Sequence, residues 1–166
     1  MKAKENHVLT ICYELREDTA QGPLLEVMNV KYPFIFLFGT GSLLPAFEAN
    51  LEGLEEGEQF EFTLEVEEAY GHPNELNIVD VPISAFYIDG KLANDLLQTG
   101  TPVSINDDSG QLHHGKVVSH SNSTVKVDFN HAMAGKRLHF FGQVLKIRKA
   151  TADEIVRKHY IPDDIR

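Results

Sequence analysis

A strictly alternating pattern of apolar and polar residues runs from Phe60 to Val66, shortly before Gly71, and a second alternating pattern starts after Gly135. Alternation of this kind indicates a strand with one buried face. The residues between the two patterns have no regular period, because prolines and glycines interrupt their apolar residues and polar turns separate short strand-like runs. The interruption, 72–130, spans about 60 residues, which is enough for a small module with its own core. A sheet-forming domain with an inserted β-rich module is therefore expected.

The second alternating pattern changes parity within itself. Leu138, Phe140 and Val144 lie on one face of the expected strand, whereas Leu145 and Ile147 lie on the other. One extra residue in a strand, a β-bulge, produces such a change. We therefore predict a bulge between Val144 and Leu145.

Two short helices interrupt the strand patterns. Apolar residues recur at helical spacing over 43–54, where Ser42 can cap the start and Gly53 suits the end. Near the C-terminus, Thr151 and Glu154 have the spacing of a capping box. That spacing predicts a helix that begins at this threonine and ends before the proline that follows.

The composition excludes several classes of function. Asp and Glu number 25 against 15 Lys and Arg, which gives a net charge of −10. This charge opposes binding to nucleic-acid phosphates and to anionic membranes, so neither partner is expected. Cys12 is the only cysteine, which precludes an intrachain disulfide, and it is read as a buried inert thiol. Together with the absence of an apolar leader, this predicts a cytoplasmic protein.

The sequence lacks the usual signatures of nucleophilic, phosphate-binding and zinc enzymes. His113, His114 and His120 could form a small metal site, but adjacent strand residues point to opposite faces, so solvated side chains are the favoured interpretation. The distinctive feature is aromatic: 10 Phe and 5 Tyr, many of them in the segments that flank the interruption. Neither a metal nor a cofactor is expected.

Residues 38–71, FGTGSLLPAFEANLEGLEEGEQFEFTLEVEEAYG, resemble the central signature of FKBP-type peptidyl-prolyl isomerases, from its Gly-x-Gly-x-Leu element to its Ala-Tyr-Gly. The corner NHAMAG, followed by Leu-x-Phe, is similar to the bacterial SlyD/SlpA branch of that family. In this branch a chaperone module, the insert-in-flap domain, interrupts the loop after Ala-Tyr-Gly. The resemblance extends from about Val8 to Thr151.

The resemblance implies an α+β fold, in which an FKBP-like antiparallel sheet wraps on a short helix and carries a small inserted β-rich domain. The isomerase domain would comprise 1–71 and 131–151. The insert-in-flap domain would be 72–130, and 152–166 would form a C-terminal helix and tail. Some relatives carry a His/Cys-rich metal-binding tail, whereas this sequence ends at HYIPDDIR, so no tail-based metal site is expected.

The resemblance also implies a prolyl-binding pocket of mostly aromatic and aliphatic side chains. Its residues would be Tyr13, Leu25, Glu26, Phe34, Leu43, Leu44, Phe47, Tyr70 and Phe140. Glu26 stands where the family usually has Asp, and Phe47 stands where some members have Trp.

In the insert, apolar side chains among prolines would bind unfolded polypeptide by adding it to a sheet edge. These residues would be Ile78, Val79, Val81, Phe86 and Tyr87. The implied function is peptidyl-prolyl cis-trans isomerisation with chaperone activity on unfolded or partly folded chains that contain X-Pro bonds, performed by a monomer. Two alternatives remain: a holdase with weak or no isomerase activity, and a metal-handling protein that uses the three histidines named above.

Overall fold

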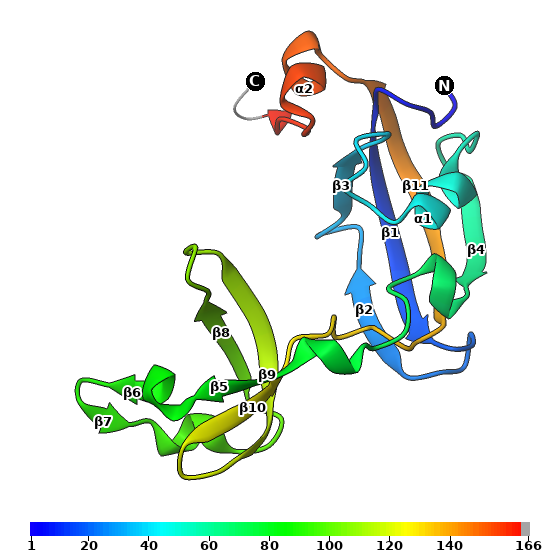
Figure 1. Cartoon of the computed structure of the whole chain (residues 1–166). Coiled ribbons are helices and arrows are strands. Elements are labelled where there is room, and N and C mark those ends of the chain that lie inside the picture. Colours follow the sequence, from blue (N-terminus) through cyan, green and yellow to red (C-terminus); the bar gives the residue numbers. More distant parts are fainter. Residues whose placement is uncertain (164–166) are drawn as a thin grey trace. The chain divides into compact units, whose positions relative to one another are not determined.

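The computed structural model describes residues 1–163 and divides into two compact units (Figure 1). The first unit contains Met1–Gly71 and the chain from Gly135 onward, and the second unit contains His72–Ala134. The second unit therefore includes the corner after residue 130, where the Ala134 amide donates to the His131 carbonyl oxygen over 2.9 Å. At the boundary, the Gly135 amide donates to the carbonyl oxygen of Gly71 over 2.7 Å. The chain therefore leaves the first unit and returns to it at adjacent positions.

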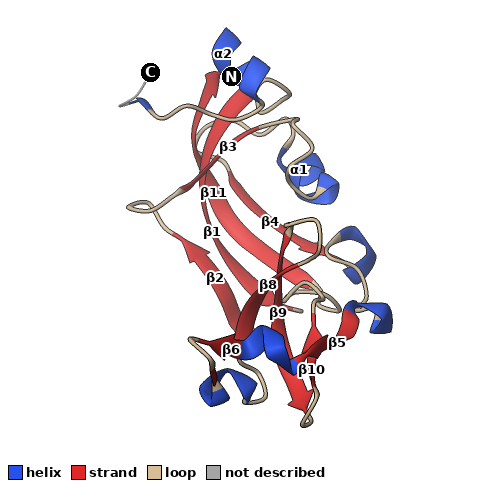
Figure 2. Ribbon diagram, turned by 60° about the vertical axis from the view of Figure 1, so that its left-hand side comes forward, coloured by secondary structure: helices blue, strands red, loops and turns tan. Residues whose placement is uncertain are grey.

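An antiparallel five-stranded sheet forms the frame of the first unit (Figure 2). Its strand order is β2 (Leu24–Met28), β1 (His7–Glu17), β11 (Leu138–Lys149) and β4 (Gln59–Leu64), and β3 (Phe34–Leu37) also pairs with β1. The short helix α1 (Pro45–Leu51) buries Phe47 and Leu51 against this sheet. The 3₁₀ helix η1 (Val66–Glu68) follows β4.

The predicted β-bulge is confirmed in the pairing of β1 with β11. Thr10 pairs with Lys146 and Ile11 pairs with Val144, which leaves Leu145 as the extra residue. The bulge changes the parity of the strand, so that Val144 and Ile147 are both buried although they are three positions apart. The bulge thus lets β11 contribute buried side chains on both sides of it, from Leu138 to Ile147.

The start of α1 differs from the prediction. Pro45 is the first helical residue, Leu44 occupies the N-cap position without a side-chain hydrogen bond, and Ser42 instead contacts the Thr40 hydroxyl over 2.7 Å. Proline has its backbone φ fixed near the helical value and needs no partner for an amide, so it determines where this helix begins. The expected Ser42 cap is therefore wrong. Gly53 does lie just beyond the helix end, with a φ of +86°.

The second unit is β-rich and has a core of its own. A four-stranded antiparallel sheet has the order β5 (Ile78–Pro82), β10 (Thr124–Asp128), β9 (Leu112–His120) and β8 (Pro102–Asn106), and β6 (Tyr87–Ile88) pairs with β7 (Lys91–Leu92). The 3₁₀ helices are η2 (Glu75–Asn77), η3 (Ile83–Phe86) and η4 (Asn94–Leu97). The buried side chains that form the core are Phe86, Leu97, Val117, Val125 and Val127. The predicted α+β class, with an antiparallel sheet on a short helix and an additional β-rich region, is confirmed.

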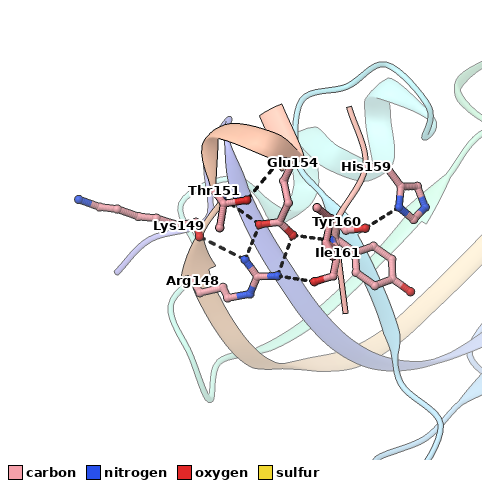
Figure 3. A network of polar contacts seen from close by, with 7 residues as sticks. All are labelled: Arg148, Lys149, Thr151, Glu154, His159, Tyr160 and Ile161. Carbon is pink, nitrogen blue, oxygen red and sulfur yellow. Dashed lines mark hydrogen bonds and ion pairs between the residues drawn. The ribbon is translucent and has the colours of Figure 1, made fainter. Parts of the chain in front are cut away.

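The C-terminal helix α2 (Ala152–Arg157) begins with the predicted capping box between Thr151 and Glu154. Glu154 is 0% exposed, and its carboxylate accepts hydrogen bonds from the two terminal guanidinium nitrogens of Arg148, over 2.7 and 2.8 Å. It also accepts from the amides of Thr151, over 2.9 Å, and Ile161, over 2.6 Å (Figure 3). One carboxylate thus ties the helix and the segment after it to β11. Within the described part of the chain, no helix is long and apolar enough to cross a membrane.

This network predicts a pH-dependent contribution to stability. Hydrogen bonding to Arg148 holds the pKa of the Glu154 carboxyl well below its usual range. A carboxyl with a lowered pKa stabilises the folded state above its unfolded pKa of about 4.5, and the contribution is lost as the pH falls further. Urea unfolding of the first unit, measured from pH 6 to about pH 2, should show a smaller acid destabilisation in Glu154→Gln than in the wild type. Parallel pH profiles would contradict this assignment.

Candidate active site

Aromatic side chains from four strands share the buried face of the first unit's sheet. Phe140 on β11 pairs with Leu15 on β1 and with Phe62 on β4, and cross-strand partners point to the same face. Tyr13, two residues before Leu15, therefore also points to this face. On β3, Phe36 pairs with Leu9, which brings a further ring to the same side.

These rings converge on Phe47 of α1. Its ring centroid lies 5.0 Å from that of Phe140, 5.9 Å from Phe62, 6.2 Å from Phe36 and 6.3 Å from Tyr13. The contacts with Tyr13, Phe62 and Phe140 are edge-to-face, the arrangement that the ring quadrupoles favour. Phe47 is thus the centre of a set of rings that we call the aromatic cluster: Tyr13, Phe34, Phe36, Phe47, Phe62 and Phe140.

One carboxylate lies beside the aromatic cluster. Glu26 pairs with Leu15 in the β1–β2 register, so it shares the face of Tyr13, and the Tyr13 hydroxyl donates to Glu26 Oε1 over 2.9 Å. Burial, together with the charge and hydrogen bond of Glu26, raises the pKa of Tyr13 far above neutral pH. The Tyr13 phenol therefore stays protonated and keeps donating to this carboxylate.

Tyr70 follows η1 and is 40% exposed, whereas Tyr13, Phe47 and Phe140 are each at most 7% exposed. Burial of part of its ring raises the pKa of Tyr70, and the charge of Glu26 raises it further. The charge of this one carboxylate therefore raises the pKa of both tyrosines, of which Tyr13 is in direct hydrogen-bond contact with it. Tyr70 is thus a protonated phenol that is accessible from solvent.

The three predicted leucines take less central positions. Leu25 is half-buried at an irregularity of β2, where Glu26 pairs with Leu15 and Leu24 pairs with the next residue of β1. Leu43 and Leu44 are half-buried immediately before α1. They adjoin the helix that carries Phe47.

Two members of the cluster, Phe36 and Phe62, were not among the predicted site residues. Phe62 stacks on Phe140 with centroids 5.2 Å apart, and Phe36 lies 5.3 Å from Phe34. The sequence does contain a signal for Phe36, because it lies two positions after Phe34 and so points to the same face of the strand. For Phe62 no local pattern gives the signal, because only the β4–β11 register places it opposite Phe140.

In the second unit, the predicted client-binding residues separate into two groups. Ile78, Val79 and Tyr87 are 37%, 43% and 50% exposed, and Val81 is half-buried. Phe86 is only 3% exposed and belongs to the core of the unit, so its side chain cannot contact a client without local unfolding. Of the residues predicted to bind a client, those with accessible side chains therefore lie on β5, an edge strand of its sheet, and at Tyr87.

Two of the three histidines of the metal-handling alternative contact other polar side chains. His113 Nε2 lies 2.8 Å from Asp107 Oδ2, and His114 Nδ1 lies 2.7 Å from the Ser104 hydroxyl. Among residues 1–163, no group of three or more His, Cys, Asp or Glu side chains is arranged to hold a metal ion.

Comparison with known proteins identifies the class to which this sheet and its aromatic cluster belong. The family model described as FKBP-type peptidyl-prolyl cis-trans isomerase matches residues 1–77. Over 159 residues, 96% of this chain, the sequence is 32% identical to the FKBP-type peptidyl-prolyl cis-trans isomerase SlyD of Escherichia coli K12, covering 77% of that protein. It is 33% identical to SlyD of Haemophilus influenzae, covering 80% of it, and 34% identical to SlyD of Aeromonas hydrophila, covering 71%.

The chain therefore belongs to the FKBP-type peptidyl-prolyl cis-trans isomerases. Within this family, the three relatives compared above, each matched over 96% of this chain, are SlyD proteins. The chain is accordingly a peptidyl-prolyl isomerase that binds proline-containing polypeptides, as the sequence resemblance predicted.

Proposed function

We propose that the aromatic cluster, with Glu26 and Tyr70 beside it, is the place where this enzyme rotates X-Pro bonds. The observation that supports this site most strongly is the convergence of rings from several strands on Phe47, together with the Glu26 carboxylate that accepts a hydrogen bond from Tyr13. Leu25, Leu43 and Leu44 would complete its apolar lining. Such a surface matches a proline ring and the apolar side chains around it.

Catalysis of this rotation needs no nucleophile. The barrier to rotation about a peptide bond, about 18–20 kcal/mol, comes from amide resonance, and X-Pro bonds isomerise in roughly tens to hundreds of seconds. In the twisted transition state the resonance is lost and the charge separation of the amide falls. A water-poor aromatic surface therefore favours the twisted amide over the planar one.

The two phenols would have different roles. Tyr70, which is accessible, would donate a hydrogen bond to a carbonyl oxygen of the substrate. Tyr13 is 7% exposed and donates to Glu26, so it would hold that carboxylate in place and form part of the apolar wall. The raised pKa of both phenols keeps these donors protonated across the physiological pH range.

Exchange spectroscopy on a proline tetrapeptide tests the site. We expect Phe140→Ala to lower kcat/KM strongly, since it removes a ring that contacts Phe47 and Tyr13. We expect Tyr70→Phe to lower it by about tenfold, the effect of one neutral hydrogen bond made in the transition state. Val127→Ala, in the core of the second unit, is the control and should leave the peptide rate unchanged. Wild-type rates in both site variants would place the catalytic surface elsewhere.

We further propose that the second unit binds unfolded or partly folded chains. β5 supports this role, since it is an edge strand whose outer backbone groups can pair with an extended peptide. Ile78 and Val79 expose apolar surface along that edge, and Tyr87 adds an exposed ring. A client held there would present its prolines to the first unit at a raised local concentration.

A holdase with little isomerase activity is the alternative function. It would keep the exposed edge of β5 but turn over proline peptides slowly. The tetrapeptide assay separates the two functions, because a holdase would suppress aggregation of an unfolded protein without accelerating peptide isomerisation.

A further inference from the structure

Glu26 has a carboxylate oxygen that the fold leaves free. Its Oε1 accepts from the Tyr13 hydroxyl, and this is the one hydrogen bond of the Glu26 side chain within residues 1–163. In the same part of the chain, no buried side-chain oxygen or nitrogen lacks a partner. The half-buried Glu26 must therefore expose Oε2 to solvent.

This free oxygen carries a negative charge at the edge of an otherwise aromatic surface. The β1–β2 register places Glu26 on the face of Tyr13 and Leu15, and Tyr13, which donates to Glu26, contacts the rings of Phe34, Phe47 and Phe140. Its charge reaches Tyr70, the exposed phenol of the site. A substrate bound on the aromatic cluster would therefore have the Glu26 carboxylate close to the side chains that flank its proline.

We propose that Glu26 is a specificity-determining residue that makes this isomerase prefer X-Pro bonds with a lysine or arginine beside the proline and disfavour those with an acidic residue there. The inference rests on the proposed active site. A basic side chain can pair with the free Oε2 while Oε1 stays bound to Tyr13, whereas an acidic side chain meets a like charge. The net charge of −10 acts in the same direction, but it acts on every part of the surface.

The test is a series of tetrapeptides that differ only in the residue before or after proline, with Lys, Leu or Glu at that position. The measured quantity is the ratio of kcat/KM for the Lys peptide to that for the Glu peptide. For a partly exposed ion pair, we expect Glu26→Gln to lower this ratio by about three- to tenfold. Glutamine can still accept from Tyr13, so the substitution removes the charge and keeps that hydrogen bond. A ratio within one variant is independent of any general loss of activity.

Glu14→Gln is the matched control. Glu14 follows Tyr13 on β1 and points to the opposite face of the sheet, where its side chain is 48% exposed. The substitution Glu14→Gln changes the net charge by one unit, as Glu26→Gln does, but on the other face of the sheet. It should therefore leave the Lys-to-Glu ratio unchanged. Glu26→Asp keeps the charge and should retain most of the preference. In about 1 M salt, where the screening length is about 3 Å, the wild-type ratio should approach that of Glu26→Gln.

An equal ratio in wild type and Glu26→Gln, at both substrate positions, would overturn the proposal. An equal fall in Glu14→Gln and Glu26→Gln would also overturn it, because it would assign the preference to the overall charge. These outcomes differ from failure of the active site itself, which appears as wild-type rates for the neutral Leu peptide in Phe140→Ala and Tyr70→Phe.

Discussion

A Phe47→Ala variant is expected to lose about 3–5 kcal/mol of the free energy of unfolding of the first unit, together with nearly all of its isomerase activity. Phe47 is 6% exposed and contacts the rings of Tyr13, Phe36, Phe62 and Phe140. Its removal leaves a cavity that these rings cannot fill without leaving their strand rotamers. Chemical denaturation followed by the first unit's aromatic circular dichroism gives the stability, and the tetrapeptide assay gives the activity.

Loss of folding and loss of catalysis must be separated in this experiment. Phe47→Leu keeps an apolar side chain at the centre of the cluster and should cost less, about 1–2 kcal/mol, so the unit remains folded at 25 °C. We expect the folded Phe47→Leu protein still to isomerise peptides more slowly than the wild type, because the edge-to-face support of Phe140 is lost. Full activity in this folded variant would show that the ring of Phe47 contributes to packing and not to catalysis.

An Arg148→Met variant is expected to lower the free energy of unfolding of the first unit by about 3–5 kcal/mol. It leaves the fully buried Glu154 carboxylate without the guanidinium that donates to both of its oxygens. The remaining donors are the amides of Thr151 and Ile161, which cannot neutralise a buried charge. Urea unfolding at pH 7 measures the loss, and hydrogen exchange of the α2 amides reports whether the helix detaches first.

The double variant Arg148→Met with Glu154→Gln is the control for this second prediction. It removes both charges, so we expect it to recover a large part of the stability that Arg148→Met loses. Arg16→Met is a matched single control, since Arg16 makes a longer and more exposed contact of 3.4 Å with Glu14. Its effect should lie below about 1 kcal/mol. Equal losses in Arg16→Met and Arg148→Met would contradict the role assigned to burial.

Local spacing predicted the features that depend only on neighbouring residues. The parity change after Val144 gave the bulge, and the spacing of Thr151 and Glu154 gave the capping box. The Ser42 cap failed because two local signals competed, and Pro45 fixed the helix start instead. Where a single local rule applies, sequence alone is therefore a sound guide.

The other contacts of the site depend on strand register, and no local sequence pattern reveals that register. The Tyr13–Glu26 hydrogen bond depends on the pairing of Glu26 with Leu15, beside an irregularity of β2. The contact of Phe62 with Phe140 likewise depends on pairing between strands that are separated by the whole second unit. The burial of Phe86 was also beyond prediction, because apolar residues without a period do not show which of them form the core.

The account assigns isomerisation to the first unit and client binding to the second unit. The most direct test is to replace residues 72–134 with a short Gly-Ser turn. Gly71 and Gly135 are already hydrogen-bonded, so a short connection can join them. The shortened protein should isomerise a proline tetrapeptide at a rate close to that of the full chain. Its catalysis of a proline-limited protein refolding reaction should fall by about a hundredfold, since client capture no longer raises the local concentration of X-Pro bonds. Undiminished refolding catalysis, or a parallel loss of peptide activity, would contradict this account.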